Sequence, residues 1–154
     1  MRIEISKSEL LFDIRNKSHS DVSVITDAES RYLAEAGTEK NDEVLRDIAS
    51  SLASLSTVTG RYLAQDVNAM ASDTATLPTT LVFNFSFSGR KADGKAQPLA
   101  NAIHEYLADN TLALFYNSVS QPDLAAKRER LAAQDLQLVD TLVHQKKAPY
   151  IIRH

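Results

Sequence analysis

The last third of the chain contains two successive segments with helical periodicity. Residues 99–116 and 122–149 each repeat apolar side chains three and four positions apart, which is the spacing of one helix face. Pro98 and Pro122 stand at the start of these segments, where the first turn of a helix tolerates proline. Only residues 117–121 separate the segments, which leaves room for a tight reversal. The sequence therefore predicts an antiparallel helical hairpin.

A third helix is expected over residues 41–65, because apolar residues recur there at the same spacing. Small residues such as Ala49 and Ser51 flank its apolar stripe and allow neighbouring helices to approach closely. We expect the hairpin to pack on this helix through apolar residues of both its segments. These residues are Ile103, Leu107, Leu114, Leu131, Leu138 and Leu142.

Helix-capping patterns divide the first forty residues. Ser6 followed by Glu9 has the spacing of a capping box and predicts a short helix that ends near Asn16. A second capping spacing begins at Thr26, and Gly37 is placed as the C-terminal cap of the helix that follows. The N-terminal third is therefore expected to be helical as well.

One segment breaks the helical pattern. Residues 79–88 alternate apolar and polar side chains, which predicts a strand with one apolar face. That face consists of Leu81, Phe83, Phe85 and Phe87. No comparable strand follows before the hairpin, so we expect the partner to be residues 2–5, residues 150–153 or another subunit. The predicted fold class is mainly α, a helical bundle with a C-terminal hairpin and a small β element.

Composition limits the classes of protein to which the chain can belong. Its 154 residues and 44% apolar content suit a single domain, residues 1–154, with a β insertion at about 68–97. The net charge of -3 argues against a protein that wraps nucleic acid. We interpret the basic residues Lys127, Arg128 and Arg130 as a solvent-exposed helix face. There is no cysteine, hence no disulfide and no thiolate site.

No segment has the pattern of an enzyme site. His104 and Glu105 begin a stretch that resembles a zinc-protease helix, but the second histidine is missing because position 108 is alanine. Arg90 and Lys91 lie in a glycine-containing stretch that is typical of a solvated turn rather than of a phosphate cradle. We therefore predict no catalytic, cofactor-binding or metal-binding residue. The N-terminal residues contain no apolar run long enough for a signal peptide or a membrane span.

The order of elements resembles the small head-tail connector, or neck adaptor, proteins of tailed bacteriophages and Mu-like prophages. In that family the penultimate helix has an alanine-rich apolar face with aromatic residues near its end, and the final helix starts with an acid and a basic pair. The matching residues of the first helix are Ala100, Ile103, Tyr106, Leu107, Leu114, Phe115 and Tyr116. Those of the second are Asp123, Lys127, Arg128, Leu131, Leu138, Leu142, Lys146 and Lys147.

The resemblance implies a non-catalytic virion protein. Such connectors assemble as rings, commonly of about twelve subunits, between the portal and the tail. The expected location is the neck of the virion, after assembly in the bacterial cytoplasm, with portal, tail or neck proteins as partners and without specific DNA binding. The inserted strand leaves the neck layer open between adaptor, stopper and terminator. The alternative is a small cytoplasmic helical adaptor or regulatory module that binds one partner protein.

A subunit interface is predicted around the strand and the C-terminal segment. An exposed strand with three phenylalanines would leave its hydrogen bonds and its apolar face unsatisfied, which favours a contact with a neighbouring subunit. The residues predicted to form it are Leu81, Phe83, Phe85, Phe87, Arg90, Lys91, Tyr150 and Ile152.

Overall fold

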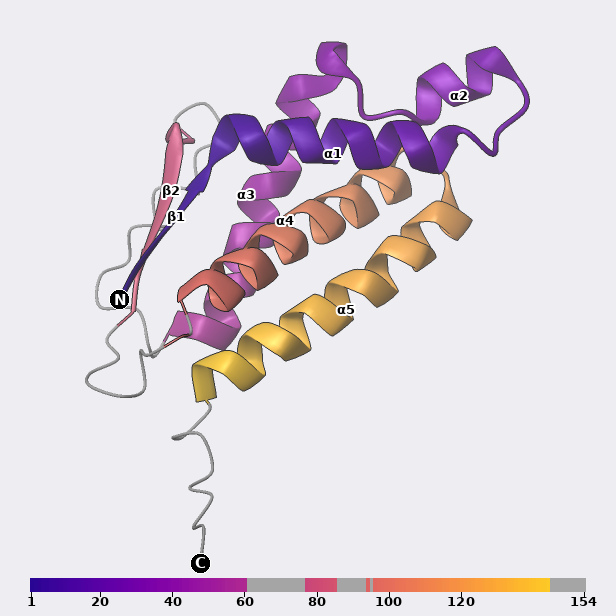
Figure 1. Ribbon diagram of the computed structural model, residues 1–154. Coiled ribbons are helices and arrows are strands. Elements are labelled where there is room, and N and C mark those ends of the chain that lie inside the picture. The colour runs from indigo at the N-terminus through magenta and orange to yellow at the C-terminus, as the bar shows by residue number, and fades with distance from the viewer. Residues whose placement is uncertain (61–76, 86–93, 95, 145–154) are drawn as a thin grey trace, which may run out of the picture.

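The structure is a computed structural model that describes residues 1–60, 77–85, 94 and 96–144. Over these residues the chain is mainly helical and has a small two-stranded antiparallel sheet, as the sequence predicted (Figure 1). Its elements follow the order β1 (Arg2–Ser6), α1 (Lys7–Val22), α2 (Ala28–Ala34), the 3-10 helix η1 (Thr38–Lys40), α3 (Asn41–Thr59), β2 (Thr80–Asn84), α4 (Ala96–Ser118) and α5 (Pro122–His144).

Helices α4 and α5 form the predicted antiparallel hairpin, and the turn between them is a Schellman motif. The backbone N–H of Gln121 donates to the carbonyl of Tyr116 at 2.9 Å, and that of Ser120 donates to Asn117 at 3.4 Å. These are the two bonds that close this type of helix end. Ser120 takes the left-handed position with a φ of 59°, where glycine is usual.

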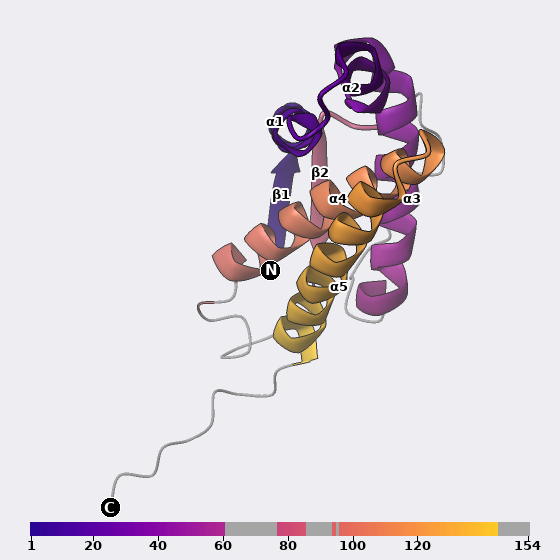
Figure 2. The same cartoon turned by 90° about the vertical axis from the view of Figure 1, so that its right-hand side faces the viewer.

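Helix α4 is the central element, because it packs against α5, α3, α1 and β1 (Figure 2). Ile103 and Leu107 are fully buried, as predicted, whereas Leu114 is only half-buried. The large side chains of α4 that have no exposed surface lie along most of its length. They are Leu99, Ile103, Leu107, Leu112, Phe115 and Tyr116. A helix that is apolar around most of its circumference is suited to this central position.

Helix α5 packs through smaller side chains than the sequence predicted. The prediction that Leu138 is buried is wrong, since that side chain is 49% exposed, and Leu131 and Leu142 are half-buried. The buried apolar positions of this helix are instead Ala125, Ala132, Val139 and Val143. Two alanines at the contact let the helix axes approach, because interaxial distance depends on the side chains between them. The leucines consequently lie beside the contact rather than within it.

The third predicted helix is confirmed as α3, which runs from Asn41 to Thr59. The last part of the predicted helix, residues 61–65, lies outside the described residues. Ala49 and Ser51 are buried, as their small size suggested. The Ser51 hydroxyl accepts a hydrogen bond from Asn110 at 2.9 Å and lies 3.3 Å from the Thr111 hydroxyl. Small residues on α3 thus bring its backbone close to α4 and add polar contacts between the two helices.

Helix α1 is longer than predicted. Ser6 caps it by accepting from the Glu9 N–H, as expected, but the helix continues past Asn16 to Val22. The polar run after Asn16 stays helical because Ser18 and Asp21 are buried and have partners elsewhere in the fold. The predicted caps around α2 are wrong. The N-cap is Asp27 rather than Thr26, and Gly37 precedes η1 with a φ of -81°, outside the left-handed region.

Strand β2 pairs with the N-terminal segment, which was one of the predicted partners. The antiparallel register places Ile3 opposite Phe83 and Ile5 opposite Leu81, and all four side chains are buried. The Met1 ammonium donates to the Phe85 carbonyl at 2.9 Å and extends this pairing. The alternative partner, residues 150–153, lies outside the described residues.

We predict that Leu107→Ala destabilises the protein by about 2–5 kcal/mol, because it leaves a cavity in the centre of α4. Leu138→Ala is the matched control on α5 and should change stability by less than about 1 kcal/mol, since Leu138 is half-exposed. Urea unfolding followed by circular dichroism measures both values. Equal costs for the two substitutions would contradict this placement of the core.

We also predict that Ser120→Gly stabilises the α4–α5 turn, whereas Ser120→Val destabilises the protein. Glycine removes the steric cost of a left-handed residue, which is about 1–2 kcal/mol, although its greater freedom in the unfolded chain offsets part of the gain. Valine increases the steric cost because it is β-branched. The order of melting temperatures should be glycine, serine, valine, and a valine variant as stable as the parent would exclude the left-handed turn.

Candidate functional site

The apolar face of β2 lies inside the chain's own core. Leu81, Phe83 and Phe85 are 1%, 1% and 2% exposed, and the rings of Phe83 and Phe85 stack with centroids 6.5 Å apart. The sequence-based hypothesis that these three side chains form a subunit contact therefore does not fit their position. The intramolecular pairing with β1 and the packing in the common hydrophobic core already cover them.

The remaining residues of the predicted interface lie outside the described residues. They are Phe87, Arg90, Lys91, Tyr150 and Ile152. Their part of that hypothesis stays a prediction.

A buried charged cluster joins α1 to the hairpin, and Arg128 is at its centre. The interpretation of Arg128 as a solvent-exposed residue is wrong, because it is only 7% exposed. Its Nε and Nη2 donate to the two carboxylate oxygens of Asp21, both at 2.7 Å. Its Nη1 donates to Asp109 at 2.8 Å. One guanidinium on α5 therefore binds carboxylates of both α1 and α4.

Asp21 receives two further donors. The Lys127 ammonium donates to it at 3.0 Å, and the Tyr116 hydroxyl donates at 2.9 Å. Burial alone would raise the pKa of Asp21, but the hydrogen bonds from Arg128, Lys127 and Tyr116 hold it below the usual value. Burial raises the pKa of Tyr116, which therefore stays protonated as the donor. Asp21 is thus ionised and well satisfied inside the fold.

Lys17 forms the second half of the cluster. Its ammonium donates to Glu105 at 2.5 Å and to Asp109 at 3.3 Å. Burial opposes the charge of Lys17, yet the hydrogen bond to Glu105 and the two carboxylates raise its pKa above the usual value. Asp135 on α5 lies beside Asp109, and burial raises its pKa to about 8, with the neighbouring carboxylates adding to that shift.

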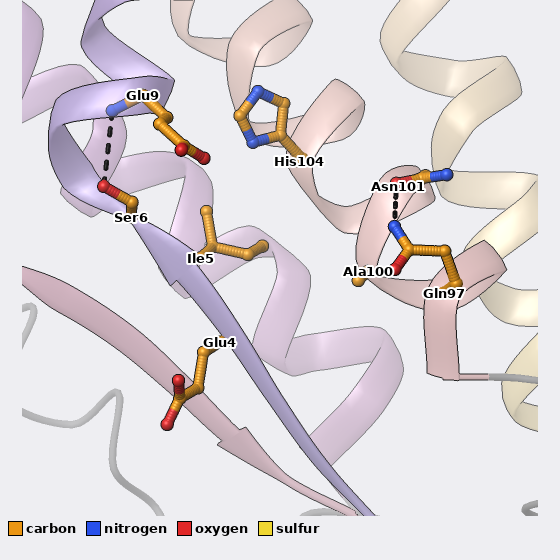
Figure 3. A pocket seen from close by; sticks show the side chains of 8 residues that line it. All are labelled: Glu4, Ile5, Ser6, Glu9, Gln97, Ala100, Asn101 and His104. Carbon is orange, nitrogen blue, oxygen red and sulfur yellow. Dashed lines mark hydrogen bonds between the residues drawn. The ribbon is translucent and has the colours of Figure 1, made fainter.

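A polar pocket of about 150 Å³ lies between β1, the start of α1 and the first turns of α4 (Figure 3). His104 and Glu9 face it from two different helices. The Nε2 of His104 lies 2.6 Å from Asp13 on α1, so a carboxylate orients the imidazole. The full lining is Glu4, Ile5, Ser6, Glu9, Gln97, Ala100, Asn101 and His104.

The pocket is best explained as part of the contact between α1 and α4. An Asp–His pair can orient a general base, but catalysis also needs a nucleophile or a substrate group within reach. The Ser6 hydroxyl is engaged as the N-cap of α1. Glu105, which the sequence singled out beside His104, binds Lys17 in the separate charged cluster. Among the described residues, no group of three or more His, Cys, Asp or Glu side chains is placed to hold a metal ion.

The buried charged cluster was missed in the sequence, although one signal for it is present. Arg128 lies three residues after Ala125 and four before Ala132, so all three share the helix face that packs on α4. Asp109 likewise interrupts an apolar helix. Charged residues on an apolar face call for buried partners. The identity of the partner was not predictable, because Asp21 is 107 positions from Arg128 in sequence.

No family model, curated protein or solved structure matches this chain. Within the described part, none of the helices combines the length and the apolar character needed to span a membrane.

We predict that Arg128→Met destabilises the fold by about 3–5 kcal/mol, because it leaves the buried carboxylates of Asp21 and Asp109 without their main partner. Arg130→Met, two residues away on the exposed side of α5, should change stability by less than about 0.5 kcal/mol. Adding Asp21→Asn to Arg128→Met should recover part of the loss, since it removes one unpaired charge. A double-mutant cycle by urea unfolding measures this coupling, and strict additivity would contradict the bidentate pair.

Proposed function

We propose that this protein is a non-catalytic structural subunit of a tailed-phage particle. In this proposal it forms a ring at the head-tail junction, between portal and tail. The support begins with the order of elements, in which a first helix, a long helix and a C-terminal helical hairpin resemble the neck adaptor proteins. The hairpin and the helices packed on it belong to the observed fold.

The observation that carries the proposal is the presence of exposed apolar side chains at α2 and on α5, in addition to Phe12 on α1, which is 62% exposed. Tyr32 and Leu33 are each 57% exposed on α2, and Val24, just before that helix, is 76% exposed. Leu138 is 49% exposed in the C-terminal half of α5. Figure 1 shows α2 near the α4–α5 turn and the C-terminal end of α5 on the opposite side. We call these the α2 patch and the α5 patch.

Two different patches fit the geometry of a ring. A head-to-tail interface joins one surface of a subunit to a different surface of the next, and it closes into a ring when the rotation allows. Large apolar side chains left in water favour such contacts. The α2 patch of one subunit and the α5 patch of its neighbour would form this interface, and the β2 face, which is buried within the chain, would take no part.

We predict that deleting the gene from the phage genome that carries it yields filled heads and free tails that do not join. The parent gene supplied in trans should restore joined, infectious particles, whereas Leu33→Asp and Leu138→Asp should not. Ser50→Asp is the matched control, because it places the same charge on an exposed polar position of α3. Electron microscopy and plaque counts give the readout, with circular dichroism to show that each variant folds.

Normal joined particles after deletion would refute the connector proposal and favour an adaptor that binds a single partner. Restoration by Leu33→Asp and Leu138→Asp at the parent level would refute the assignment of the interface to the two patches. Mixing the two purified variants tests whether the contact is head-to-tail. Leu33→Asp keeps an intact α5 patch and Leu138→Asp keeps an intact α2 patch, so a head-to-tail contact can join one molecule of each variant and gives dimers only.

A further inference from the structure

Asp135 faces a cluster that holds more carboxylates than cations. The charged groups that surround it come from α1, α4 and α5, the three helices that meet at this point. The cations of the cluster are Lys17, Lys127 and Arg128. Its carboxyl groups are Asp21, Glu105, Asp109 and Asp135. If every carboxyl group were ionised, one negative charge would lack a partner.

The cations are already engaged with the other three carboxylates. Arg128 and Lys127 bind Asp21, the third donor of Arg128 binds Asp109, and Lys17 is shared between Asp109 and Glu105. Asp135 is left with a buried oxygen, Oδ2, that has no hydrogen-bond partner. An ionised carboxylate in this position would have one buried oxygen without a partner and would be repelled by its neighbours, which is an unfavourable arrangement.

A proton on Asp135 resolves this conflict. Two carboxylates cannot hydrogen-bond to each other, because both are acceptors, but a carboxylic acid can donate to a carboxylate. The side chains of Asp135 and Asp109 are within hydrogen-bonding reach. A protonated Asp135 therefore gains a hydrogen bond and removes the excess negative charge of the cluster, whose net charge becomes zero.

We propose that Asp135 is a proton-binding site which stays protonated at neutral pH, donates to Asp109 and loosens the contact between α5 and α4 when it ionises. This inference is independent of the proposed connector function. The pKa of Asp135 is raised to about 8, mainly by burial and next by the hydrogen bond and charge of Asp109. The positive charge of Lys17 opposes this rise.

The sign of the pH dependence follows from the two states of the chain. In the unfolded chain an aspartate has a pKa of about 3.9, so between about pH 4 and pH 8 only the folded state holds this proton. The contribution of Asp135 to stability is fully present below about pH 4, is lost as the pH rises to about 8, and is constant above that value. The unfolding equilibrium constant would rise by up to about tenfold for each pH unit within this window.

The test compares the parent protein with Asp135→Asn, because asparagine keeps the size and the donor of the protonated acid without its ionisation. Asp47, whose pKa burial raises to about 6, titrates in both proteins and cancels in the comparison. Between about pH 5.5 and pH 8.5, the unfolding equilibrium constant of the parent should rise by at least about tenfold relative to that of Asp135→Asn. Asp42→Asn, at an exposed position of α3, should show no such change.

A direct titration completes the test without any variant. In the parent protein, the ¹³C resonance of the Asp135 carboxyl group should titrate with a midpoint between about pH 7 and pH 9. Amide exchange in α5, corrected for its intrinsic pH dependence, should accelerate across the same midpoint. A midpoint near pH 4, a pH-independent ratio for Asp135→Asn, or unchanged protection of α5 would each overturn the proposal.

Discussion

The buried guanidinium of Arg128 is the constraint on which the arrangement of α1 and α5 around α4 depends. A guanidinium out of water must be matched by carboxylates in defined positions, and here these come from Asp21 on α1 and Asp109 on α4. Apolar contacts alone would tolerate small shifts of α1 along the hairpin, whereas a bidentate pair does not. The cluster thus sets the position of α1, and Ser18, which accepts from the Ala36 N–H, fixes the chain after α2 against it.

The sequence predicts the elements of this fold better than their contacts. The hairpin, the third helix and the strand follow from local periodicity and proline positions, which need no tertiary information, whereas the N-terminal segment was one of three partners left open for the strand. The prediction of which face of α5 is buried was wrong, because it favoured leucines at seven-residue spacing over Ala125 and Ala132. Hydrophobicity ranks leucine first, but close helix packing selects small side chains. The burial of Arg128 was missed for a similar reason, because a charged residue ranks as exposed and its partner Asp21 is distant in sequence.

The burial of the β2 face changes where assembly contacts are to be sought. A strand with apolar side chains at alternate positions looked suited to a neighbouring subunit, but Phe83 and Phe85 complete the core next to α4. Among the described residues, the exposed large apolar side chains lie on α1, at α2 and in the second half of α5. For a ring this is favourable, because rigid helices present their side chains with a defined direction, so that the angle between neighbouring subunits is well determined.

The proton site and the α5 patch are linked through their positions on one helix. Leu138 follows Asp135 by three residues, so the two side chains are neighbours on the surface of α5. A subunit packed over Leu138 would remove water from Asp135 as well, and a drier carboxyl group binds its proton more tightly. Linkage is reciprocal, so a protonated Asp135 would in turn favour that contact. Under the two proposals together, assembly takes up protons, and alkaline pH weakens both the packing of α5 on α4 and the association of subunits.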